Sequence, residues 1–120
     1  MHLAGVEWEE PAAWKFKLVE DAHYVMAWRV LGGELKRNEY QELEVRFYRR
    51  GQPLDGLELE VLGWMPDHGH GFLRGAEVER LSSGSFRVSG VLFHMRGDWE
   101  LTFDVAQAQR VDKLVFGVQL

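Results

Sequence analysis

Two short segments of this sequence concentrate side chains that can bind a metal ion. The first runs from Met65 to Gly71 and reads Met-Pro-Asp-His-Gly-His-Gly, and the second is Phe93-His94-Met95. Together they contain three of the five histidines and two of the four methionines. Imidazole nitrogen binds copper and zinc, whereas thioether sulfur prefers the soft ion Cu(I). The sequence therefore predicts a metal site with ligands drawn from Met65, His68, His70, His94 and Met95.

The spacing of these residues would let several side chains reach one ion. His68 and His70 are two positions apart, so on an extended segment both rings lie on the same side. Gly69 between them permits a backbone bend that would bring the rings together. His94 would come from a separate segment, and a site closed by two segments is better preorganised than a single flexible loop. We therefore expect the two segments to meet in space.

Each candidate ligand also has a purely structural interpretation. The His-Gly-His sequence at 68–70 is compatible with a polar turn. His94 continues the apolar face of a predicted strand, as a histidine of the core or its rim would. On a regular strand Met95 would point away from His94, which favours packing against a tryptophan. Met65 is open to both interpretations, ligand or packing residue.

The two segments also carry a family resemblance. The pattern Met65-Pro66-x-His68-x-His70, followed later by Phe93-x-Met95-x-Gly97-x-Trp99-Glu100, resembles the YtkA-like domain family and, more distantly, FixH-type proteins. The resemblance covers residues 40–105. It implies a small extracytoplasmic immunoglobulin-like β-sandwich linked to copper handling, including copper supply to respiratory oxidases. The matched residues are Met65, His68 and His70 in the first segment, and Met95, Gly97, Trp99 and Glu100 in the second. His94 lies beside the second motif, and we add it from the residue pattern alone.

The composition indicates one folded domain that does not bind nucleic acid. The chain has 120 residues, 46% of them hydrophobic, and a net charge of −5 with a pI near 5.5. An acidic chain without a Lys/Arg cluster offers no electrostatic footprint for phosphate groups. We predict a single β-sandwich domain over residues 1–120, in which residues 1–13 form a lead-in or an additional edge strand.

The absence of cysteine narrows the chemistry further. It excludes a disulfide, a thiolate nucleophile, a cysteine zinc site and a blue-copper centre, which needs a thiolate. It is compatible with an oxidising compartment. No apolar run approaches the ~20 residues of a membrane helix, and no signal peptide precedes residue 10. From the family resemblance we expect a periplasmic or otherwise extracytoplasmic domain whose leader has been removed.

Alternating apolar and polar residues predict the strands that would position the two segments. A period of two is clearest at 42–47 and 99–105. Gly32-Gly33 marks a turn, and Gly90 inside an alternating run predicts a bulge. About seven short strands without a long helix indicate an all-β fold. We predict an immunoglobulin-like antiparallel β-sandwich, with a small β-barrel as the alternative.

These observations favour a metal-binding module over an enzyme. We expect the domain to carry or sense copper for a copper-accepting or membrane partner protein, with zinc as the alternative metal. No nucleophile elbow, phosphate loop or HExxH motif stands out, and the carboxylates lie in alternating surface rows, so we predict no enzymatic activity. The alternative function is a metal-free immunoglobulin-like domain that binds another protein.

Overall fold

Strands form where apolar and polar residues alternate, as the sequence predicts. In the computed structural model, which describes residues 1–3 and 5–120, strand β7 alternates exposed and buried residues along its whole length. The described residues include eight strands of at least five residues: β3 (Lys15–Val19), β4 (Tyr24–Leu31), β5 (Gln41–Arg49), β7 (Glu58–Met65), β9 (Glu77–Ser82), β10 (Ser85–Val91), β11 (Asp98–Gln107) and β12 (Arg110–Gln119). The shorter elements are β1 (His2–Leu3), β2 (Val6–Glu7), β6 (Gln52–Pro53), β8 (His70–Gly71) and the 3-10 turns η1 (Pro11–Ala13) and η2 (Glu20–Ala22).

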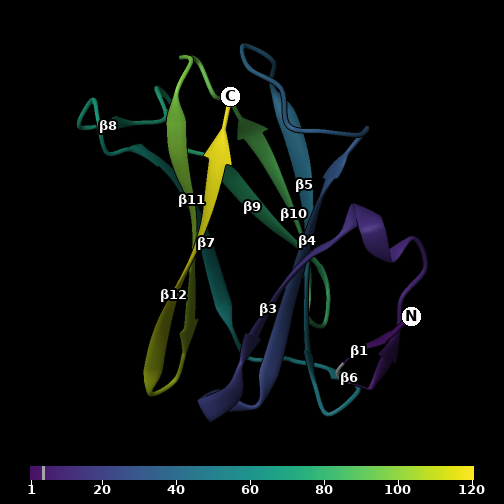
Figure 1. Cartoon of the computed structure of the whole chain (residues 1–120). Coiled ribbons are helices and arrows are strands. Elements are labelled where there is room, and N and C mark those ends of the chain that lie inside the picture. Colours follow the sequence, from purple (N-terminus) through teal and green to yellow (C-terminus); the bar gives the residue numbers. More distant parts are fainter. Residues whose placement is uncertain (4) are drawn as a thin grey trace.

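The strands form an immunoglobulin-like antiparallel β-sandwich, which confirms the predicted fold class. The first sheet has the order β3-β4-β5-β10-β9, with β6 paired to β5, and the second has the order β12-β11-β7-β8. Figure 1 shows the two sheets facing each other. No helix among the described residues is long and apolar enough to cross a membrane.

The hydrophobic core lies between the two sheets. Phe103 of β11 packs on Trp28 of β4 with ring centroids 5.6 Å apart, so the second sheet is joined to the first. Within the first sheet, Phe47 and Phe86 make an edge-to-face pair at 5.8 Å. Fully burying a large apolar side chain contributes about 1.5–3 kcal/mol. The inward faces of the strands therefore supply the main force that holds the sandwich together.

The N-terminal segment adds no edge strand to either main sheet within the described residues, in contrast to one of the two predictions for residues 1–13. Strands β1 and β2 pair only with each other. Trp8, which follows β2, is buried with Trp14 in a second apolar cluster around Ala27 of β4. The two indole rings are 5.1 Å apart in an edge-to-face arrangement. This burial of Trp8 against the outer face of the first sheet explains why the segment covers the sheet rather than extends it.

Two chain crossings between the sheets lie at the same end of the sandwich. Residues 66–76 lead from the end of β7 to β9, and residues 92–97 lead from the end of β10 to β11. Because β7 and β11 are antiparallel, with Trp64 opposite Glu100, the end of β7 lies beside the start of β11. The topology therefore brings the two predicted ligand segments together.

Strand β10 ends earlier than the alternating pattern indicates. Gly90 has a φ of 73°, and the pairing of β10 with β5 shifts register between Val88 and Val91. The predicted bulge is thus confirmed. Beyond it, the carbonyl oxygen of Phe93 accepts a hydrogen bond at 2.9 Å from the backbone N–H of Asn38. His94 consequently lies on a connecting segment rather than on a regular strand.

Candidate metal centre

The segment after β7 folds back into a tight turn that presents His70 to the interior. The backbone N–H groups of His68 and Gly69 donate to the carbonyl oxygen of Met65 at 3.2 and 2.8 Å. Gly69 has a φ of 69°, a conformation that glycine adopts without strain. The turn lets His70 pair with Met65 in the β7–β8 ladder. Cross-strand partners lie on the same face of a sheet, so His70 faces the core side, as Met65 does.

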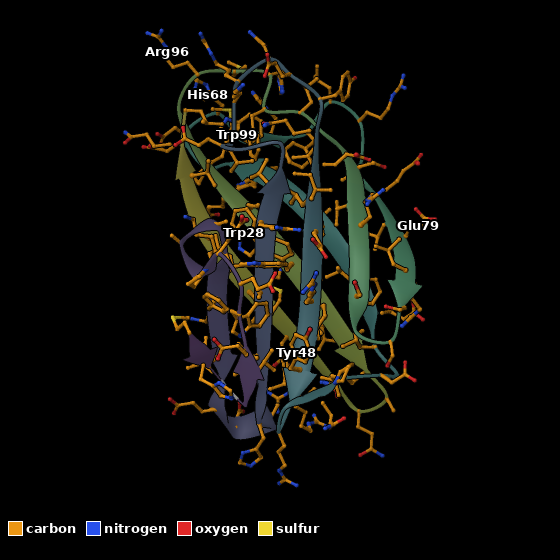
Figure 2. The ribbon with its side chains drawn as sticks, turned by 90° about the vertical axis from the view of Figure 1, so that its right-hand side faces the viewer. Trp28, Tyr48, His68, Glu79, Arg96 and Trp99 are labelled. Atoms are coloured by element: carbon orange, nitrogen blue, oxygen red, sulfur yellow. The ribbon has the colours of Figure 1, made fainter. Side chains whose placement is uncertain are left out.

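The structure brings the three predicted histidine ligands together. The ring centroids of His68 and His70 are 5.7 Å apart, and those of His70 and His94 are 5.4 Å apart. His68 is exposed, whereas His70 and His94 are half-buried. Figure 2 shows His68 and Trp99 at the same end of the sandwich. The three rings therefore form a row from solvent towards the core, which we call the histidine row.

An aromatic wall supports the inner half of the histidine row. Trp99 is buried and lies 5.5 Å from the ring of His94 and 6.5 Å from the ring of His70, between ring centroids. Its indole N–H donates to the carbonyl oxygen of Met95 at 3.0 Å. This hydrogen bond fixes the segment that carries His94 against β11. The Trp99 ring thereby sets the depth to which both imidazoles enter the sandwich.

One nitrogen of the histidine row has no partner among the described residues. The Nδ1 atom of His94 is buried from solvent and makes no hydrogen bond. Buried ring nitrogens normally pair with a protein group, an ordered water or a metal ion. The Nδ1 atom of His94 is therefore suited to donate a hydrogen bond to a ligand or to bind a metal ion.

Met65 and Met95 both have packing roles. Met65 is 0% exposed, and its Cε methyl lies only 3.0 Å from the position that a Cβ atom on Gly97 would occupy. Gly97 has a φ of 140°, a backbone conformation that favours glycine, and a side chain there would have to displace the Met65 methyl by a few tenths of an ångström. Met95 is half-buried and packs against the edge of the core. Their role as metal ligands stays a prediction.

A contact between Gly63 and Phe72 positions the crossing that carries His70, and sequence reasoning missed it. The Phe72 ring occupies the space that a side chain at residue 63 would fill. It packs against Phe93 at 5.3 Å and against Trp99 at 5.7 Å between ring centroids. A glycine inside an alternating strand indicates close approach of another group, and Gly63 is such a signal.

The histidine row is not a preformed ion cage. Among residues 1–3 and 5–120, no group of three or more His, Asp or Glu side chains is arranged to hold a metal ion.

Fold and site together define an all-β sandwich with a histidine row at the end where two crossings meet. No family model matches the chain, and no curated protein matches its sequence. The structure is similar to the crystal structure of a DUF4426 family protein from Pseudomonas aeruginosa PAO1, with a TM-score of 0.68 and 10% sequence identity. The match covers 91% of this chain and 95% of that chain. At this identity the similarity establishes the fold alone.

Proposed function

We propose that this domain binds copper through the histidine row and carries or senses the ion for a partner protein. The observation that supports the proposal most strongly is the meeting of His68, His70 and His94, which come from two crossings distant in sequence. The unpaired Nδ1 of His94 adds a donor atom without a competing hydrogen bond. The resemblance of the two segments to the YtkA-like domain family, which is linked to copper handling, is a further reason for this proposal.

The spacing of the rings is compatible with a shared ion. Two imidazoles bound to one ion at ~2.0 Å and a tetrahedral angle place their ring centroids about 5 Å apart. The centroid distances of 5.7 and 5.4 Å along the histidine row are close to this value. Rotation of two neighbouring rings, with His70 as one of them, would therefore let their nitrogens converge on one ion.

The neighbouring side chains favour copper over zinc. Met65 and Met95 flank the histidines in sequence, and thioether sulfur stabilises Cu(I). Imidazole also binds Cu(II), so one ligand set serves both oxidation states. Neither ligand type needs a reduced thiol, which suits an oxidising compartment. An extracytoplasmic location and a copper-accepting or membrane partner protein therefore belong to the proposal.

Metal titration tests the proposal directly. Wild type should bind one Cu(I) in anaerobic competition with a chromophoric chelator, and one Cu(II) in aerobic calorimetry. His70→Ala and His94→Ala should each weaken both affinities by more than about tenfold, because each removes a direct ligand. His23→Asn is the matched control, since His23 lies in the turn before β4, away from the histidine row. Parallel Zn(II) titrations decide between the two metals.

A conservative methionine variant separates the ligand role from the packing role. Met95→Leu keeps the volume of the side chain and removes its sulfur. We expect a lower affinity for Cu(I) and an unchanged affinity for Cu(II) if Met95 is a ligand. The proposal fails if wild type binds copper no more tightly than the His70→Ala and His94→Ala variants, and a metal-free interaction domain is then favoured.

A further inference from the structure

Strand β12 is a long free edge of the second sheet. It lies at the outside of the sandwich in Figure 1, and within the described residues it pairs only with β11. The pairing runs one to one from Asp98–Gln119 to Gln107–Arg110 without a bulge. A long, flat edge strand presents unpaired N–H and C=O groups that another strand can bind.

The other strands at sheet edges carry features that discourage such pairing. On β3, Lys15 and Lys17 lie opposite Trp28 and Met26, so they share the inward face of the sheet. Inward-pointing charges on an edge strand discourage pairing with another strand. β9 (Glu77–Ser82) is mostly exposed and carries three charged residues, and the edge of β7 is partly covered by β8. β12 also carries charged residues, but they lie at its first end, where Arg110 and Asp112 form an ion pair. The rest of the strand after Lys113 is uncharged. With ten residues against five in β3 and six in β9, and with neither a bulge nor a proline, β12 is the longest regular edge among the described residues.

The hydrogen-bond pattern identifies the free groups of β12. Gly97 and Leu120 exchange both backbone hydrogen bonds, at 2.9 and 3.0 Å. In an antiparallel ladder such pairs alternate with pairs that make no bonds, so even-numbered residues of β12 point their N–H and C=O groups at β11. The odd-numbered residues point theirs away from the sheet: Val111, Lys113, Val115, Gly117 and Gln119.

This set of free groups is complementary to itself. If β12 pairs antiparallel with a second β12 about a two-fold axis at Val115, then Val111 meets Gln119 and Lys113 meets Gly117 of the second copy. All five free residues then find partners, and shifting the axis to Leu114 leaves one unpaired. We propose that the protein forms a two-fold symmetric homodimer through β12, in which the second sheets of both copies become one continuous sheet.

The side chains along β12 support the same register. Val115 is 45% exposed and lies beside Thr102, which lies beside Leu62 of β7, itself 39% exposed. Pairing at Val115 would place Val115, Thr102 and Leu62 in line with the same three residues of the second copy. Apolar surface of both copies would then be buried. Lys113 would face Gly117 of the second copy, so no like charges would lie directly opposite each other.

Charge variants at Val115 test both the dimer and its register. The axis places residue 115 of each copy opposite itself, so Val115→Lys and Val115→Glu should each be monomeric in sedimentation equilibrium, while an equimolar mixture should form a heterodimer. Val111→Lys is the matched control, because residue 111 meets Gln119 of the second copy and should leave the dimer intact. Circular dichroism establishes that each variant is folded, and chelator keeps the experiment independent of metal.

Three results would overturn the proposal. The first is a wild-type protein that stays monomeric up to millimolar concentration. The second is a Val115→Lys protein that dimerises as wild type does, which would place the interface elsewhere. The third is a mixture of the two charge variants that stays monomeric, which would contradict the register at Val115.

Discussion

Replacing Gly63 by alanine should destabilise the sandwich and disturb the histidine row together. A Cβ atom at residue 63 would overlap Cε1 and Cζ of Phe72 and lie 2.7 Å from its Cδ1. Carbon atoms in contact prefer about 3.5–4.0 Å, so the Phe72 ring must move by about 1 Å or more. Because Phe72 belongs to the crossing that carries His70, its displacement should alter the position of His70 relative to His94.

The size of the effect follows from the contacts that Phe72 would lose. Its ring makes aromatic pairs with Phe93 and Trp99 at 5.3 and 5.7 Å, and each such pair contributes about 0.5–1.5 kcal/mol. Overpacking of a filled core costs about 1–3 kcal/mol, which agrees with the loss of both pairs. For a chain of this length, this cost lowers the melting temperature by about 4–12 °C.

Gly75→Ala is the matched control for Gly63→Ala. Gly75 lies on the same crossing, and a Cβ atom there would meet nothing within 4 Å. Its substitution should change the free energy of unfolding by less than about 0.5 kcal/mol. Urea denaturation followed by tryptophan fluorescence measures both variants, and copper titration reports on the histidine row. Equal stability of the two variants would refute the argument that Phe72 needs the space at Gly63.

Two further variants test contacts other than the one between Gly63 and Phe72. Hydrogen bonds from the Arg110 guanidinium and the Tyr24 hydroxyl hold the pKa of Asp112 below its usual value, although burial acts in the opposite direction. The resulting stabilisation is present above the unfolded-state pKa of about 3.9 and is lost as pH falls through the folded-state pKa. The stability difference between wild type and Asp112→Asn, measured in urea, should therefore narrow from pH 6 to pH 3, and a constant difference would contradict this. Trp99→Phe keeps an aromatic ring but leaves the carbonyl oxygen of Met95 without its 3.0 Å hydrogen bond. The free energy of unfolding should therefore fall by about 1–3 kcal/mol. An unchanged midpoint of urea denaturation would show that this hydrogen bond contributes little to stability.

The fold is predictable because its strands are half-buried. Strands such as β5 and β7 have one face against the core, so the alternation of residue types reports directly on the sheet. β4, which is buried on both faces, is an exception. The N-terminal segment lacks such a pattern. The position of Trp8 depends on a cluster with Trp14 and Ala27, which come from other parts of the chain. Local sequence therefore left open whether residues 1–13 lead into the sheet or extend it.

The meeting of the histidines is predictable for a different reason. Their residue types and spacing alone indicate a shared site, and two crossings at one end of a sandwich bring these distant segments together. The sequence does not predict how deeply each imidazole is buried. Whether an imidazole faces solvent, like His68, or lies against Trp99, like His94, depends on the Phe72 ring filling the space beside Gly63 and on the hydrogen bond from Trp99. Because these contacts join residues from three segments, tertiary packing sets the positions of the histidines, and the proposed metal site should respond to substitutions at Gly63 that touch no ligand.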